Sequence, residues 1–143
     1  MAKSRRIEII VDVEVNPTED PDKVRLAVNE IFGELDFEIA DEENRKILIG
    51  KGHDFASLSK FHELLLRDRI LSAARKILFR GTNGNMITFF LNKQAAFVGH
   101  ISFSEPFGES PLGPITLIIT VENPEQVIDW LAPSSRRRQE IED

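Results

Sequence analysis

The sequence predicts an α+β fold: a two-layer sandwich in which helices cover one face of a largely antiparallel sheet. Three observations support this. The chain has 143 residues, which suits one domain. Its apolar pattern switches between the periods of strands and helices in the order β α β β α α β β β α. Strands therefore follow strands directly, as in antiparallel sheets. We expect residues 1–133 to form a single domain and residues 134–143 to form a flexible tail.

The first half of the chain begins with a clear strand signal. Residues 6–15, RIEIIVDVEV, alternate apolar and polar side chains and predict a half-buried strand with an acidic outer face. Asp20 and Pro21 then predict the start of a helix, because Asp caps helices and Pro suits their first position. Residues 36–40 and 45–51 predict two short strands joined by a polar turn.

The long helical segment, residues 54–80, does not read as one straight helix. Its apolar residues before Arg67 and those after it are centred on faces about 120° apart. We therefore expect two helices with a break near Arg67 and Asp68, with Asp68 capping the second. Gly81 is expected to end that second helix.

A hairpin is predicted next. Residues 86–91 and 97–103 read as its two strands, with Asn92, Lys93 and Gln94 at the turn. Residues 115–121 predict another strand. A last helix is expected between Asn123 and Pro133, with Trp130 packed in the core beside its apolar residues.

Composition excludes several classes of protein. The chain has no Cys, which excludes a disulfide framework and a thiol nucleophile. It has no apolar run long enough to span a bilayer, and its basic start soon meets acidic residues, unlike a signal peptide. We expect a cytoplasmic protein with no membrane partner. The net charge is −6, yet residues 53–100 carry seven basic and three acidic side chains.

No catalytic constellation is visible. The chain lacks a phosphate-binding loop, a dinucleotide fingerprint and a nucleophile elbow. His53, His62 and His100 do not have the spacing of metal ligands. Asp12 and Glu14 share one strand face, but no basic or nucleophilic partner can be assigned to them. We expect no enzyme activity, no metal and no cofactor.

The basic middle segment holds the candidate binding residues. Arg69, Lys76 and Arg80 fall within about 40° of one another on the second predicted helix of the pair. Cations and amides of this kind can position phosphates and contact single-stranded bases. The same cations would also suit a solvated helix face near a helix C-terminus. The candidate RNA-binding residues are Arg69, Lys76, Arg80, Asn83, Asn85, Asn92, Lys93 and Gln94.

The amino-acid sequences of several segments resemble those of a known family. These segments are VNPTEDPDKV, LSKFHELLLRDRILSAAR, FFLNKQAAFVGHISF, SPLGPI and IDWLAP. They are similar to an uncharacterised archaeal protein family over residues 6–133. The resemblance implies an α+β fold similar to the ribosomal protein that binds 5S ribosomal RNA, and it implies RNA binding. It implies no catalytic residues.

Three functions remain after these steps. The first is a non-catalytic RNA-binding module. The second is a protein–protein interaction or homodimerisation module that would use an uncovered sheet face or an edge strand, including Ile10 and Ile118. The third is an enzyme whose site is assembled from residues distant in sequence.

Overall fold

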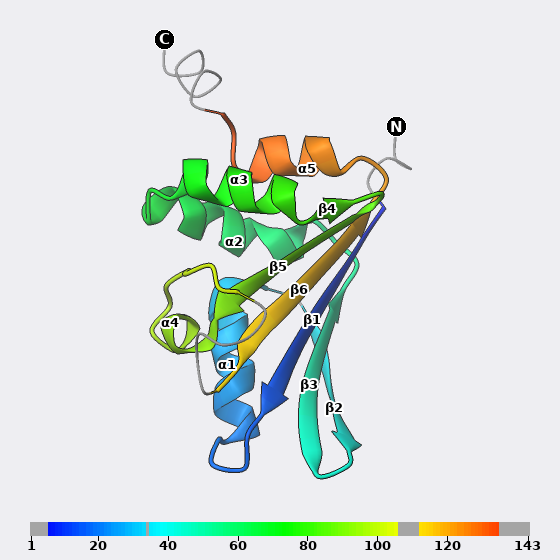
Figure 1. Cartoon of the computed structure of the whole chain (residues 1–143), viewed down its shortest axis with the longest axis vertical. Coiled ribbons are helices and arrows are strands. Elements are labelled where there is room, and N and C mark those ends of the chain that lie inside the picture. Colours follow the sequence, from blue (N-terminus) through cyan, green and yellow to red (C-terminus); the bar gives the residue numbers. More distant parts are fainter. Residues whose placement is uncertain (1–5, 34, 106–111, 135–143) are drawn as a thin grey trace.

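The computed structural model describes residues 6–33, 35–105 and 112–134 (Figure 1). Its strands are β1 (Ile7–Val15), β2 (Asp36–Glu42), β3 (Arg45–Gly52), β4 (Thr82–Asn83), β5 (Met86–Asn92) and β6 (Pro114–Val121). Its helices are α1 (Pro21–Ile31), α2 (Ala56–Arg67), α3 (Leu71–Arg80), α4 (Lys93–Phe97) and α5 (Pro124–Leu131).

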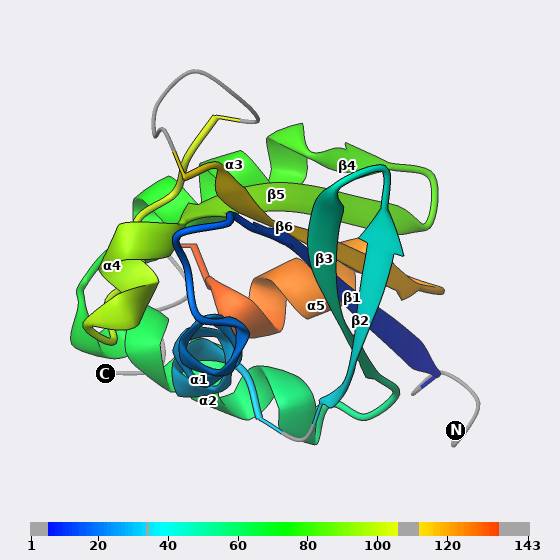
Figure 2. The same ribbon diagram turned by 90° about the horizontal axis from the view of Figure 1, so that it is seen from below.

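The six strands form one sheet in the order β2-β3-β1-β6-β5-β4, and all neighbouring strands are antiparallel. One face of this sheet is buried. In β1 the alternate residues from Ile7 to Val15 are buried, while the residues between them are exposed or half-buried. The helices cover the buried face, as Figure 2 shows from below. The predicted α+β architecture is confirmed.

Three stacked rings join the helices to the sheet. Phe61 of α2 stacks on Phe32, which follows α1, with ring centroids 5.1 Å apart. On the sheet side, the centroids of Phe61 and Phe89 of β5 lie 5.5 Å apart. All three side chains are almost completely buried. Such ring pairs stabilise a core somewhat beyond the effect of their buried area alone.

The predicted break between two helices is present, but its chemistry differs. α2 ends at Arg67 and α3 begins at Leu71. Arg69 between them has a positive φ of 56°, the left-handed conformation that reverses the chain. Asp68 does not cap α3, whose N-cap residue is Ile70 and has no side-chain cap. The carboxylate of Asp68 instead accepts hydrogen bonds from Arg67 Nε at 2.9 Å and from the backbone N–H of Ile101 at 3.3 Å.

The hairpin predicted around residues 92–94 is wrong. Residues 93–97 form α4, and the expected strand 97–103 contributes only one isolated bridge, between Phe103 and Leu91. Local chemistry explains the helix, because the Asn92 side chain accepts a hydrogen bond from Ala95 N at 2.9 Å. Lys, Gln and Ala then follow in sequence, and all three favour helices. The main partners of β5 are β6 and the short β4, which the sequence pattern did not reveal.

The proposed tail, residues 134–143, lies outside the described residues apart from Ser134. In the described part of the chain, none of the helices is long and apolar enough to cross a membrane.

Candidate functional site

The exposed side of α3 carries unneutralised positive charge. Lys76 and Arg80 are both exposed, and α3 itself contains no acidic residue. Among the described residues, no carboxylate lies within ion-pair distance of either cation. Arg75 differs, because its guanidinium is 2.7 Å from Asp129 of α5. Within the described ranges, the cations of α3 that lack an ion pair are therefore Lys76 and Arg80.

Arg69 is exposed, but it does not belong to the same helical stripe. It precedes α3 and has a left-handed backbone, so the spacing of 100° per residue that grouped it with Lys76 and Arg80 does not apply. It lies at the N-terminal end of α3, whereas Arg80 lies at the other end. Those ends are about 14 Å apart at the rise of an α-helix. Arg69 is thus an exposed cation just before the N-terminal end of α3.

Two of the predicted amides lie just beyond α3. Asn83 and Asn85 are exposed at the tight turn between β4 and β5. Gly84 begins the two-residue loop with a φ of 61°, which such hairpin turns favour. α3 continues directly through Gly81 into this hairpin, where Gly81 O accepts a hydrogen bond from Thr88 N at 2.9 Å. The turn and the C-terminal end of α3 therefore belong to one continuous segment of surface.

Lys93 does not face solvent, so its predicted role as an RNA contact is wrong. Its side chain is 0% exposed. The ammonium donates to Glu14 O at 2.7 Å, to Leu112 O at 2.7 Å and to Glu19 Oε1 at 3.0 Å. These partners come from the end of β1, the loop before α1 and the segment before β6. Lys93 therefore holds three chain segments together.

The two amide side chains beside Lys93, those of Asn92 and Gln94, differ in their surroundings. Asn92 is the N-cap of α4, so its side-chain oxygen is used within the fold. Gln94 remains exposed on α4. However, α4 follows the end of β5, whereas Asn83 and Asn85 precede its start. A strand of this length spans about 20 Å, and Figure 1 shows α4 well separated from α3. Gln94 is thus not part of the surface formed by α3 and the β4–β5 turn.

The uncovered face of the sheet is acidic. Its charged residues are Glu8, Asp12 and Glu14 of β1, Asp36, Glu38 and Glu42 of β2, and Arg45 and Lys51 of β3. Burial raises the pKa of Asp12, as does nearby Glu42, while the charge of Arg45 offsets part of this effect. Phosphates would be repelled by this face. The described part of the uncovered sheet face is therefore a poor site for a polyanion.

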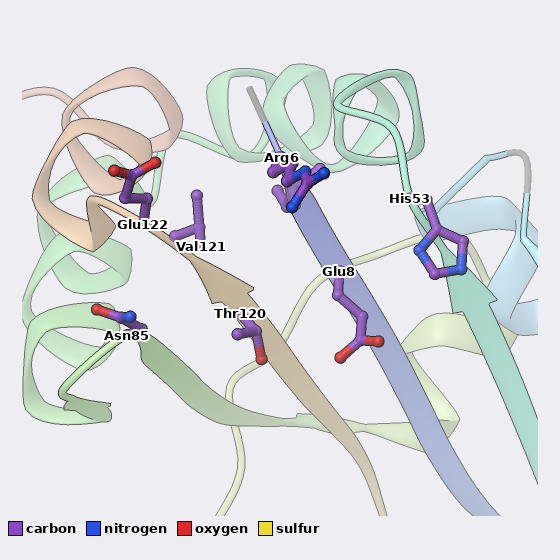
Figure 3. Close-up of a pocket in the computed structure, with 8 residues that line it drawn as sticks. Arg6, Glu8, His53, Asn85, Thr120, Val121 and Glu122 are labelled. Carbon is purple, nitrogen blue, oxygen red and sulfur yellow. The ribbon is translucent and has the colours of Figure 1, made fainter. Parts of the chain in front are cut away.

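A shallow pocket of about 650 Å³ lies at one end of the sheet. Figure 3 shows Asn85 and Glu122 at one side of this pocket and His53 at the other, with Arg6 and Glu8 between them. The pocket is thus lined by both cationic and acidic side chains, so the charge of its lining does not favour an anionic ligand. No group of three or more His, Asp or Glu residues in the described ranges could hold a metal ion.

A family model described as RNA binding matches residues 8–121. A relative from Sulfurisphaera tokodaii, a UPF0201 protein, is 49% identical over 91% of this chain and 90% of its own length. This chain belongs to the UPF0201 family. The similarity to an uncharacterised archaeal family, which the sequence segments indicated, is confirmed.

Solved structures agree with this membership. The crystal structure of the UPF0201 protein from Methanococcus jannaschii is 35% identical, with a TM-score of 0.80 over 88% of this chain and 99% of that one. A DUF54 protein from Methanothermobacter thermautotrophicus has a TM-score of 0.62 at 21% identity over 88% of this chain and 98% of that one, and it shows the fold alone. The implied similarity to the ribosomal protein that binds 5S ribosomal RNA stays a prediction.

In this UPF0201 protein, sequence reasoning missed the aromatic residues at the surface. Phe79 of α3 is exposed beside Arg80, and the guanidinium of Arg75 lies 4.9 Å from its ring centroid. Trp130 was expected in the core, yet it is 38% exposed and stacks on His62 with ring centroids 4.6 Å apart. One weak feature of the sequence could have indicated that Phe79 is exposed. It lies three residues after Lys76, on the same side of α3, and outside the set of buried residues Leu71, Ala74 and Leu78.

Proposed function

We propose that this protein is a non-catalytic RNA-binding module and that it contacts RNA through the α3 surface, defined as Arg69, Lys76, Phe79, Arg80, Asn83 and Asn85. The observation that carries the proposal is the pair of exposed cations, Lys76 and Arg80, neither of which forms an ion pair with a described carboxylate of this acidic protein. Unpaired cations that are held on a rigid helix are suited to contact phosphates. The description of the matching family model supports the same function.

The other members of the α3 surface give this contact its chemical character. Phe79 offers an exposed ring on α3 next to Arg80 in sequence, and bases of single strands stack on such rings. Asn83 and Asn85 carry both a donor and an acceptor, so they can distinguish base edges. In duplex RNA, the major groove is too deep and narrow for side chains to read the base edges. We therefore expect preference for single-stranded RNA.

Binding of RNA oligonucleotides, measured by fluorescence anisotropy at several salt concentrations, tests the proposal. Each lost phosphate contact should lower the salt slope by about 0.7 for single strands. The variant Lys76→Gln/Arg80→Gln should therefore bind more weakly to every sequence and lower the slope by about 1.4. Asn83→Ala should instead change the preference among bases and leave the salt slope unchanged.

A matched control removes two charges elsewhere. Arg45 and Lys46 are exposed at the start of β3, just after the β2–β3 turn, and Figure 1 shows this end of β3 remote from α3. Arg45→Gln/Lys46→Gln should bind RNA like the parent protein. Equal losses in both double variants would show that only overall charge matters and would contradict the α3 surface. Absence of salt-dependent binding by the parent protein would contradict RNA binding itself.

A further inference from the structure

Three large apolar side chains are exposed together where α1 and α4 meet. Leu26 of α1 is 59% exposed, and Phe97 and Val98 at the end of α4 are 40% and 71% exposed. They line a groove of about 460 Å³, together with Lys23, Ala27, Glu30 and Gly99. Figures 1 and 2 both show α1 and α4 side by side. Clustered apolar exposure of this kind, bordered by charges, is typical of an interface between proteins.

The exposed position of Val98 is fixed by the structure around it. α4 ends at Phe97 and Val98 caps it; Gly99 follows with a φ of 77°, and His100 N donates to Ala95 O at 2.9 Å. Together with the bond from Gly99 N to Ala96 O, this is the hydrogen-bond pattern of a glycine-ended helix. Arg67 Nη2 also donates to Gly99 O at 2.7 Å, which ties the segment to α2. Val98 is therefore presented to solvent by an anchored turn.

The charges that border the groove are arranged symmetrically along α1. Lys23 and Glu30 lie at equal distances in sequence from the midpoint between Leu26 and Ala27. Seven residues span almost two helical turns, so the two charges share one side of α1, about 10 Å apart. Neither has an ion-pair partner among the described residues. The border of the groove thus carries one free charge of each sign on either side of an apolar centre.

We propose that this groove binds a second copy of the same chain, through a two-fold axis that passes between Leu26 and Ala27. Such an axis places α1 antiparallel to its counterpart, with Lys23 of each copy facing Glu30 of the other. The contact is closed, because each patch is its own complement. Val98 and Phe97 of each copy then cover Leu26 and the groove of the other. The acidic sheet face, in contrast, would repel its own copy.

Sedimentation velocity over a range of protein concentrations tests the dimer. The parent protein should dimerise. Lys23→Glu should weaken the dimer about tenfold or more, because two attractive contacts become two contacts between carboxylates. Glu30→Lys should do the same through contacts between ammonium groups. The double variant Lys23→Glu/Glu30→Lys should restore the dimer, because both contacts again join opposite charges.

An equimolar mixture of the two single variants gives a stricter test. Lys23→Glu in one copy faces Glu30→Lys in the other, and the second contact keeps its native residues, so the heterodimer should form where neither homodimer does. Val98→Asp should abolish the dimer, whereas Leu66→Asp, at an exposed leucine of α2, should not change it. Circular dichroism would confirm that all variants are folded.

Two results would overturn this dimer. One is a parent protein that stays monomeric at every concentration. The other is a double charge reversal that dimerises no better than the single variants. The dimer is independent of the α3 surface, so Lys76→Gln/Arg80→Gln should leave the dissociation constant of the dimer unchanged.

Discussion

Lys93 and Glu19 form an ion pair that solvent barely reaches: Nζ lies 3.0 Å from Oε1, and the side chains are 0% and 9% exposed. Asn16 completes the arrangement, because its backbone N–H and its side-chain amide both donate to Glu19 Oε1, at 3.0 and 2.8 Å. Burial alone would raise the pKa of Glu19, but the hydrogen bonds from Asn16 and the charge of Lys93 lower it overall. Glu19 therefore stays ionised in the fold.

The first prediction concerns this pair. Lys93→Met removes the charge that compensates Glu19 and the hydrogen bonds that Lys93 donates to Glu14 O and Leu112 O, although Leu112 O keeps the bond from Asn16 Nδ2 at 3.0 Å. We expect a loss of about 3–5 kcal/mol in the free energy of unfolding, measured by urea denaturation. Gln94→Met, at the exposed neighbouring position, should change it by less than about 0.5 kcal/mol.

A second variant separates buried charge from packing. Lys93→Met/Glu19→Gln should lose less stability than Lys93→Met alone, because no uncompensated carboxylate then remains buried. A double variant that is less stable than the single one would show that Glu19 acts through other contacts.

The burial of Lys93 shows why this part of the fold could not be predicted. Asn begins turns and caps helices equally well, and a helix of five residues is too short to show a helical period in its sequence. The partners of Lys93 come from positions up to 79 residues away in sequence. No local pattern announces such contacts, so a buried lysine and an exposed lysine look the same in the sequence.

Elements with strong local signals were predicted well. The alternation of β1 is the observed burial pattern, and Asp20 caps α1 through Asp22 N at 3.0 Å. Asn123 likewise caps α5 through Gln126 N at 3.3 Å. The exposure of Lys76 and Arg80 followed from the buried period of α3. Arg69 was grouped with them wrongly because its left-handed backbone depends on how α2 and α3 pack.

The second prediction compares two aromatic residues. Phe61 stacks between Phe32 and Phe89 and is 0% exposed, so Phe61→Ala should cost about 3–5 kcal/mol of unfolding free energy. Trp130→Ala should cost less, about 1–3 kcal/mol, because the indole is 38% exposed, although its ring also contacts the rings of Phe55 and His62. Urea denaturation of both variants measures the difference. An equal or larger loss for Trp130→Ala would contradict this order.

The third prediction concerns the pH dependence that His62 adds. Burial lowers the pKa of His62 from its ordinary value of 6.5, and Glu63 offsets only part of this effect. The unfolded chain therefore binds the proton more readily than the folded protein. Stability from this group is fully present above pH 6.5 and is lost as pH falls through the folded pKa.

Two measurements check the behaviour of His62. An NMR titration of its ring protons should give a pKa below 6.5, and Trp130→Ala should bring that pKa closer to 6.5 by exposing the ring. His62→Gln should reduce the slope of unfolding free energy against pH just below pH 6.5. A slope that His62→Gln leaves unchanged would mean that other groups carry this pH dependence.

The fourth prediction tests the close approach between α3 and β5. A Cβ atom on Gly81 would lie 1.9 Å from the carbonyl oxygen of Thr88, which is backbone and cannot swing away. Gly81→Ala should therefore cost about 1–3 kcal/mol of unfolding free energy or more, since the end of α3 must move away from β5.

Gly33→Ala is the matched control, because nothing lies within 4 Å of its added Cβ. It should be neutral or stabilising by up to about 1 kcal/mol, through lower entropy of the unfolded chain. Thermal unfolding of both variants gives the comparison, and a Gly81→Ala protein as stable as Gly33→Ala would show that α3 and β5 are not held in this contact.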